Sequence, residues 1–200
     1  MNMMNAMSTK DVGAATKRPR GRPRDTALRN RILATAAELA AGEGVEIGFD
    51  RIAQAAGASR TTLYRWWRSP HELFLDALLE SARTPPDPAD SPVLERIRAQ
   101  LEAAAVVLVD RPTAAPLRVL AAGALTSAPD ADSFRTHWLA PRRGLARELI
   151  RLGIDEGVIV DEDPELLIDL LFAPLYHRAF FTGAPIDDDL IDALLARVRR

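Results

Sequence analysis

Apolar residues recur every three or four positions through most of this 200-residue chain, which is the spacing of amphipathic helices. No segment shows the alternation of apolar and polar residues that is typical of a half-buried strand. The pattern therefore predicts an all-α fold. The helical segments that it predicts are about 25–41, 49–68 as two helices, 70–83, 93–109, 112–127, 134–156, 164–182 and 187–198.

Glycine and proline mark the expected ends and breaks of these helices. Gly42 and Gly44 are expected to end the first helix. Pro116 and Gly123 are expected to interrupt segment 112–127, and Pro141 is expected to kink or divide the long segment that follows it.

Residues 49–68 have the spacing of two short helices that cross closely. Ala53 is small at the expected crossing, and Gly57 stands where a left-handed turn favours glycine. The side chains expected to face inward are Ile52, Ala56 and Leu63. Those left facing outward are Arg60, Thr61, Thr62, Tyr64 and Arg65. Such a helix suits a DNA major groove, although a corner between helices without any DNA contact has the same spacing.

A basic segment precedes the first helix. Residues 17–24 read KRPRGRPR, with five basic residues and no acid. The polar, small and aperiodic composition of residues 1–24 predicts a disordered arm. The run from Arg20 to Pro23 resembles an AT-hook, whose extended Arg-Gly-Arg fits a narrow minor groove. A solvated tail that contacts only phosphates is the alternative.

The sequence after the second crossing helix predicts a further helix and then a boundary. Residues 69–72, SPHE, form a capping box with proline at the first helical position. Residues 84–92, TPPDPADSP, form a break. We therefore expect a basic arm at 1–24, a DNA-binding domain at 25–83 and a helical domain at 92–200.

Charge and composition narrow the function further. Residues 1–83 hold 13 Lys and Arg against 9 Asp and Glu, whereas residues 84–200 hold 13 against 19. A basic front and an acidic back suit a protein that docks nucleic acid with one end. The chain has no cysteine, and its three histidines are scattered, so we expect no metal site and no cofactor. We also expect no enzymatic activity, because no nucleophile–base pair or phosphate loop is found.

The N-terminus lacks the apolar stretch of a secretory signal. No apolar run approaches the roughly 20 residues that span a bilayer. We therefore expect a cytoplasmic protein without membrane contact.

Four helices of which the second and third form a helix-turn-helix, followed by a larger helical region, resemble the TetR family of transcriptional regulators. The likeness is tightest over 32–79, where Thr62 to Tyr64, Trp67 and the Ser-x-x-Glu-Leu of 69–73 are specific together. Residues 139–186 more weakly resemble a tetracycline-repressor-like C-terminal domain. The resemblance implies an N-terminal helix-turn-helix DNA-binding domain joined by a fourth helix to a helical ligand-binding and dimerisation domain.

By this resemblance Arg60, Thr61 and Thr62 reach base edges, Tyr64 holds a phosphate, and Trp67 is the buried aromatic that locks the recognition helix to the fourth. The sequence departs from the family at Gly48, which replaces a Ser or Thr cap, and at Pro70, which replaces a phosphate-binding Lys. A backbone amide at His71 or Glu72 could partly replace that contact. The candidate DNA-binding residues are Arg20, Arg22, Arg24, Arg60, Thr61, Thr62, Tyr64, Arg65 and His71. Whether Trp66 is buried or meets the DNA backbone stays open.

The resemblance also implies a homodimer formed through the last two long helices. Residues 164–181 are apolar on more faces than one chain's core can cover, which agrees with this interface. The interface candidates are Leu145, Leu149, Leu167, Leu171, Leu175, Tyr176 and Phe180, with His177 and Arg178 as polar members. A two-fold dimer predicts a palindromic operator.

The leading hypothesis is a repressor that a small hydrophobic ligand releases from its operator. The candidate pocket residues are Leu101, Ala105, Leu108, Leu120, Leu125, Phe134 and Trp138, for each of which core packing is the alternative. Their apolar character predicts an uncharged or weakly polar effector. The alternative function is a constitutive or architectural DNA-binding protein without an effector.

Overall fold

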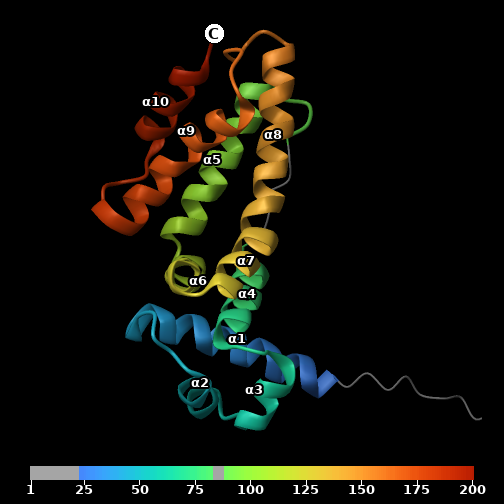
Figure 1. Ribbon diagram of the computed structural model, residues 1–200, viewed down its shortest axis with the longest axis vertical. Helices are drawn as coiled ribbons and strands as arrows, with labels where there is room; N and C mark the ends of the chain where they lie inside the picture. The colour runs from blue at the N-terminus through green and yellow to red at the C-terminus, as the bar shows by residue number, and fades with distance from the viewer. Residues whose placement is uncertain (1–22, 83–87) are drawn as a thin grey trace, which may run out of the picture.

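The computed structural model describes residues 23–82 and 88–200, and these residues are almost entirely helical (Figure 1). The described ranges contain no β-strand and only one isolated bridge, between Ile159 and Arg199. The predicted all-α fold is therefore confirmed. The helices are α1 (Pro23–Glu43), α2 (Phe49–Ala56), α3 (Arg60–Trp66), α4 (Pro70–Ser81), α5 (Val93–Val109), α6 (Arg111–Thr126), α7 (Ala128–Phe134), α8 (Ala140–Asp155), α9 (Pro164–His177) and α10 (Asp188–Val198), with π-helical turns η1 (Arg135–Leu139) and η2 (Arg178–Thr182).

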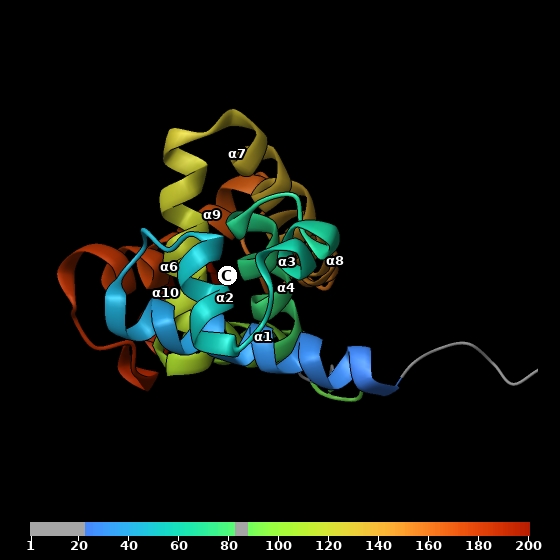
Figure 2. The same ribbon diagram turned by 90° about the horizontal axis from the view of Figure 1, so that it is seen from below.

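The helices form two groups stacked along the long axis of the molecule. Helices α1 to α3 lie at one end, and α5, α8, α9 and α10 lie towards the other, where the chain ends (Figure 1). Seen from the first end, α2 and α3 lie in front of the rest (Figure 2). Helix α4 leads from the first group towards α6 and α7, so it connects the helix-turn-helix to the larger group.

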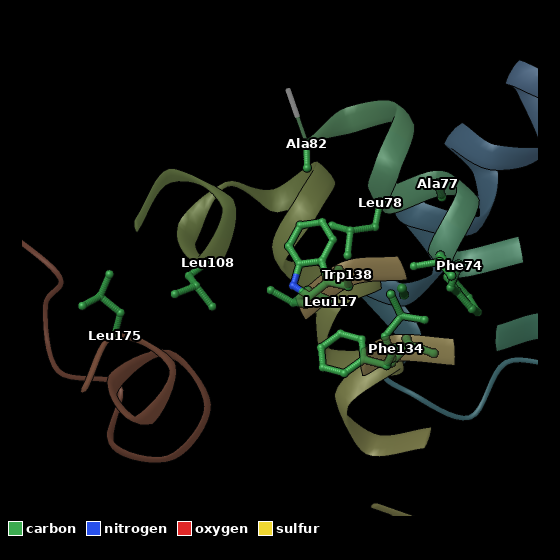
Figure 3. Packing of buried hydrophobic residues seen from close by; sticks show 14 of the residues in the cluster. Phe74, Ala77, Leu78, Ala82, Leu108, Leu117, Phe134, Trp138 and Leu175 are labelled. Carbon is green, nitrogen blue, oxygen red and sulfur yellow. The ribbon is translucent and has the colours of Figure 1, made fainter. Parts of the chain in front are cut away.

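One hydrophobic core runs through both groups without a break. It extends from Ile32 in α1 to Val198 in α10. Phe74 and Leu78 of α4 and Leu117 of α6 belong to it, and Figure 3 shows them together with Trp138 of η1. Because α1 and α4 both pack on α6, a displacement of α6 must also disturb the helices that position α3.

Ion pairs join the helices of the larger group at its surface. Arg143 of α8 binds Glu165 and Asp169 of α9, at 2.7 and 2.6 Å, and Arg147 adds a second contact to Glu165 at 2.5 Å. Arg98 of α5 pairs with Asp192 of α10. In the described ranges no helix has the length and apolar character needed to cross a bilayer.

The first helix and α6 differ from their predicted limits. Helix α1 begins at Pro23, so Arg24 lies in its first turn and not in an extended arm. Helix α6 is continuous through Pro116 and Gly123. Proline removes only one helical hydrogen bond, and the buried positions around Pro116 hold the helix in place. Gly123 marks a close approach: a Cβ there would lie 2.7 Å from Nδ1 of His71.

The segment predicted as one long helix at 134–156 is also different. Helix α7 begins at Ala128, capped by the Ser127 side chain, and the widened turn η1 separates it from α8. The backbone stays right-handed helical from α7 through η1 into α8, so Pro141 follows a helical turn to which it cannot donate a hydrogen bond. The helix is thus not divided at Pro141, and it widens into a π-helical turn directly before the proline.

Candidate DNA-binding interface

The turn between α2 and α3 has the geometry that the sequence predicts. Gly57 is left-handed, with φ 60° and ψ 38°, and its amide donates to the carbonyls of Ala53 and Gln54. Ala53 is buried at the crossing, as are Ile52, Ala56 and Leu63. Gly48 precedes α2 in an extended conformation and makes no side-chain cap. The two helices are thus fixed by one glycine turn and a small apolar contact.

The first turn of α3 is held by two hydroxyl groups. Ser59 Oγ accepts the amide of Thr62 at 3.1 Å and lies 2.8 Å from Thr62 Oγ1. Thr62, which the sequence predicts to face outward, is half-buried. Its hydroxyl stabilises the start of the helix before any DNA is bound, and sequence reasoning missed this role and its partner Ser59.

The outer surface of α3 presents two basic residues and two hydroxyl groups, because Arg60, Thr61, Tyr64 and Arg65 are exposed. Arg60 Nε lies 2.6 Å from Oδ1 of Asp50. Both side chains face solvent, and such a pair contributes only about 0–1 kcal/mol, so a DNA group can displace the carboxylate.

Tyr64 is positioned by an aromatic contact while its hydroxyl stays accessible. Its ring meets that of Phe49 edge-on, with 4.9 Å between centroids, and the residue is 57% exposed. An edge-to-face contact of this kind restricts the direction in which the ring points. The hydroxyl is therefore held at the outer surface, as a phosphate contact requires.

The end of the recognition helix is anchored by a buried tryptophan and one carboxylate. Trp67 is 3% exposed, and its Nε1 donates to Oδ2 of Asp76 at 2.8 Å. The same oxygen accepts from Arg29 at 2.9 Å. Asp76 of α4 therefore joins the end of α3 to α1. Sequence reasoning missed both Asp76 and Arg29, and the only pointer in the sequence is a single acid inside the apolar run LFLDALL.

Trp66 packs against its neighbour. It is half-buried and meets Trp67 edge-on, with 5.6 Å between ring centroids. The guanidinium carbon of Arg65 lies 5.8 Å from the Trp66 ring centroid. Packing therefore covers part of the Trp66 ring, and the rest is left exposed beside Arg65.

The cap of α4 differs by one residue from the predicted capping box. Ser69 Oγ accepts the Glu72 amide at 3.2 Å, as expected. The Glu72 carboxylate, however, accepts the amide of Arg68 at 2.6 Å and not that of Ser69. Pro70 occupies the first turn. The carboxylate thereby fixes the link between α3 and α4.

The side chain of His71 points away from the DNA-facing surface, which limits its predicted role. It is 7% exposed and lies between α4, α6 and α7, with Nδ1 3.8 Å from Oδ2 of Asp130. Its Nε2 has no hydrogen-bond partner in the described part of the chain. Only the backbone amide of His71 remains a candidate DNA contact. Burial lowers the pKa of His71 below its usual 6.5, and Asp130 partly opposes this shift.

Acidification should therefore weaken the fold through His71. Since the folded pKa is below 6.5, the unfolded chain binds the proton first, and the free energy of unfolding falls as pH drops from about 6.5 towards the folded pKa. Urea unfolding of the wild type and of His71→Asn between about pH 5.5 and 7.5 measures this. The variant should have a flatter profile, and His137→Asn is the matched control because it removes an exposed histidine. Parallel profiles for wild type and His71→Asn would contradict the assignment.

The predicted pocket residues lie in or around the packed core, with one exception. Leu101, Leu108, Leu120, Phe134 and Trp138 are buried, and Ala105 is half-buried. Leu125 is 85% exposed near the end of α6, so its assignment to the pocket is wrong. A helical period cannot show that this side chain extends past the helices that would cover it. None of the seven lines either of two surface hollows, of about 510 and 290 Å³.

The predicted dimer residues also differ in their exposure, since some are accessible and others are buried inside their own chain. Leu145 is exposed, and Tyr176 and Phe180 are half-buried. The remaining four are buried inside their own chain, so their assignment to the surface of an interface is wrong: Leu149, Leu167, Leu171 and Leu175. Because α9 is apolar on nearly all faces, its sequence does not show which face packs on α5 and α8.

The remaining predictions concern the arm and metals. Arg20 and Arg22 lie outside the described residues, and Arg24 lies in α1. Within 23–82 and 88–200 no three acidic or histidine side chains are grouped in a way that could hold a metal ion.

Comparison with known proteins agrees with this geometry. Residues 32–77 match the family described as bacterial regulatory proteins of the tetR family, and residues 87–198 match the tetracyclin repressor-like C-terminal domain. The uncharacterized HTH-type transcriptional regulator YdeS of Bacillus subtilis (strain 168) is 32% identical over 181 residues, which cover 88% of this chain and 90% of YdeS.

Solved structures extend the likeness to three dimensions. The TetR family transcription regulator SCO0332 is 34% identical, with a TM-score of 0.63, over 85% of this chain and 95% of that one. A TetR transcriptional regulator from Agrobacterium tumefaciens shares the fold at 20% identity, with a TM-score of 0.64 over 87% and 95% of the two chains. The chain therefore belongs to the tetR family of bacterial regulatory proteins and is a DNA-binding transcriptional regulator.

Proposed function

We propose that this regulator is a repressor that binds a palindromic operator as a homodimer and is released by a small molecule bound in its C-terminal domain. The observation that carries the proposal is the exposed surface of α3, with Arg60, Thr61, Tyr64 and Arg65 outermost at one end of the molecule. Arginine and hydroxyl side chains on such a helix can read base edges and hold phosphates.

An exposed apolar surface on α8 and α9 supports a two-fold dimer. Its leucines are exposed on the sides of these helices that face away from the core: Leu145, Leu152, Leu166 and Leu170. Leu166 and Leu170 line the hollow of about 510 Å³, together with His177 and Arg178. Phe181 extends this surface. A second copy of the chain can cover it by presenting the same surface, as two-fold interfaces do.

Release from DNA requires a connection between the two helical groups, and α4 supplies it. Helix α4 holds Trp67 through Asp76 on one side and packs on α6 through His71 on the other. A ligand that shifts α6 or α7 changes the packing of α4 and therefore the position of α3. To release the operator, the ligand must bind the DNA-incompetent state more tightly, by about 1–3 kcal/mol.

Replacing Arg60 by alanine tests the assignment of the α3 surface. Loss of a base-reading arginine should weaken binding to a selected operator by about 1–3 kcal/mol and relax the preference for one base position. Selection of bound DNA from a random pool, followed by titration of the best site, measures both. Arg135→Ala, which removes an exposed arginine from η1, is the matched control and should bind like the wild type. Equal affinities for Arg60→Ala and wild type would contradict the assignment.

Deleting residues 1–22 tests the basic arm. We expect weaker binding to the same operator and a shallower salt dependence, with the slope of log K against log salt reduced by about 0.9 for each phosphate that the arm would otherwise neutralise. Replacing only Arg20 and Arg22 by serine separates minor-groove binding from a general charge effect, since it should also reduce a preference for A·T pairs beside the operator. A deletion that leaves the salt slope unchanged would show that the arm does not touch DNA.

A constitutive DNA-binding protein without an effector is the second candidate. The observation in its favour is that the predicted pocket residues are packed in or around the core and line neither surface hollow. A small-molecule screen for operator release separates the two. Release by any compound at a concentration that leaves the fold intact favours the ligand-responsive repressor.

A further inference from the structure

Three polar side chains of the C-terminal helices meet in apolar surroundings without an acidic partner. The indole Nε1 of Trp138 in η1 is completely buried and has no hydrogen-bond partner in the described residues. Arg142 of α8 stacks on the same ring, with its guanidinium carbon 3.2 Å from the ring centroid. Tyr176 of α9 lies close to both of them.

The guanidinium of Arg142 is not neutralised by the described part of the chain. Its only hydrogen bond there, at 3.1 Å, goes to the carbonyl of Trp138, and no carboxylate of those residues lies within ion-pair distance. The arginines nearby on α8 differ, because Arg143 and Arg147 are both bound to Glu165. Burial lowers the pKa of Arg142, as expected for a cation that is removed from water without an anion beside it.

The Trp138 indole and the Tyr176 hydroxyl are both hydrogen-bond donors, and Arg142 acts on both residues. Burial raises the pKa of Tyr176, which keeps its hydroxyl protonated, while the Trp138 N–H and Arg142 act in the opposite direction. The Tyr176 hydroxyl is thus near the indole N–H but does not complete a hydrogen bond with it. A buried N–H without an acceptor costs about 1–3 kcal/mol, so an acceptor placed here is strongly favoured.

We propose that Trp138, Arg142 and Tyr176 form the effector site of this regulator, and that the effector is a carboxylate attached to an apolar body. Two N–H donors, one phenolic hydroxyl and one positive charge match the two acceptor oxygens and the single charge of a carboxylate. The site rests on the ligand-responsive function proposed above. It differs from the uncharged effector expected from the sequence, because Arg142 was not among the predicted pocket residues.

Apolar side chains beside the three polar groups match the apolar body of the proposed effector. In Figure 3 the indole nitrogen of Trp138 points towards the side on which Leu108 of α5 and Leu175 of α9 lie. Both leucines are buried. Arg142 and Tyr176 are half-buried, so the charged end of the site is nearest to solvent. A hydrocarbon or aromatic body attached to the carboxylate would extend between α5 and α9.

The position of Trp138 connects this site to the DNA-binding helices. Figure 3 shows its ring turned towards Leu78 of α4 and close to Leu117 of α6. Trp138, Arg142 and Tyr176 line neither surface hollow, so the ligand is bound by parting η1 and α8 from α9. That movement displaces Trp138 against α4. The ligand therefore binds only when the packing of α4 has changed. It thus has a higher affinity for the DNA-incompetent state, as release from the operator requires.

The experiment uses the full-length protein with acetate, octanoate and phenylacetate, each beside its neutral amide, and with inorganic phosphate. Calorimetry measures affinity, and the indole N–H signal of Trp138, assigned with Trp138→Phe, reports the site by NMR. We expect octanoate or phenylacetate to bind and to shift this signal, with the neutral amides, acetate and phosphate at least about 10-fold weaker. Carboxylates that do not bind, or that bind no better than their amides, would overturn the proposal.

Two variants test the assigned residues with a matched control. Arg142→Gln should weaken octanoate or phenylacetate binding by about 10–100-fold and leave that of the amide nearly unchanged. Tyr176→Phe keeps the aromatic ring and should weaken carboxylate binding by about 2–10-fold. This second variant preserves the test if Arg142→Gln does not fold. Arg151→Gln removes an exposed arginine of the same helix and should bind like the wild type. Unchanged affinity in both site variants would overturn the proposal.

The same titrations separate the site from the proposed function. If a carboxylate binds through Arg142 but leaves the selected operator occupied, the binding site stands and induced release is wrong. If another compound releases the operator while no carboxylate shifts the Trp138 signal, the repressor function stands and this site is wrong.

Discussion

Replacing Leu170 by aspartate is expected to convert the proposed homodimer into a monomer and to lower its affinity for the selected operator by about 10²- to 10⁴-fold. Leu170 is 51% exposed in the middle of α9, and it lines the hollow that also holds His177 and Arg178. In a two-fold interface the new carboxylates would be desolvated without a partner, and like charges would meet near the axis. The weaker DNA binding follows because two recognition helices no longer bind as one unit.

Sedimentation gives the oligomeric state, and operator titration gives the affinity. Leu125→Asp is the matched control, because it places the same charge on a more exposed leucine of α6, away from α8 and α9. That variant should remain dimeric. Substitutions at Leu171 or Leu175 would not be informative, since those side chains are buried and an acid there disrupts the fold itself. A dimer that survives Leu170→Asp would place the interface on another surface.

Replacing Trp67 by alanine should lower the free energy of unfolding by about 3–5 kcal/mol. The ring is buried between α3 and α4, and its N–H satisfies one oxygen of Asp76. Removal leaves a cavity and leaves Asp76 bound to Arg29 alone. Operator binding should fall with it, because α3 is no longer held against α4.

The adjacent tryptophan is the natural control for this change. Trp66→Ala removes the same side chain from a half-buried position and should cost about 1 kcal/mol. Urea denaturation of the two variants measures the difference directly. Asp76→Asn keeps an oxygen for the indole N–H and removes the ion pair with Arg29. The loss of unfolding free energy in this variant should therefore lie between the losses in Trp66→Ala and Trp67→Ala. Equal destabilisation by Trp66→Ala and Trp67→Ala would show that the hydrogen bond to Asp76 contributes little.

The helix-turn-helix was predictable because its determinants are local. The left-handed turn at Gly57, the small Ala53 and the inward Leu63 lie within eleven positions of one another, and each is required by backbone geometry or close packing. The partners that hold this unit in place were not predictable in the same way. Asp76 meets Trp67 and Arg29 only after three helices have packed, and no sequence period indicates which polar side chains will meet.

The C-terminal domain shows a different limit of sequence reasoning. The apolar residues of α9 identify a helix, but they surround it, so Leu171 and Leu170 have the same pattern and opposite environments. Only the tertiary packing decides between them. The role of Arg142 could not be predicted from the sequence either, because α8 contains several arginines. Only the tertiary structure shows that Arg143 and Arg147 pair with Glu165 while Arg142 does not.

The close approach of Gly123 to His71 has a consequence for how this regulator can vary. Any larger residue at 123 would push the imidazole, and with it α4, because the ring is enclosed and cannot swing away. The absence of a side chain at this one position therefore lets α4 and α6 pack closely around the imidazole. Variation at residue 123 is therefore expected to change the packing between α4 and α6 while the exposed surface of α3 stays as it is.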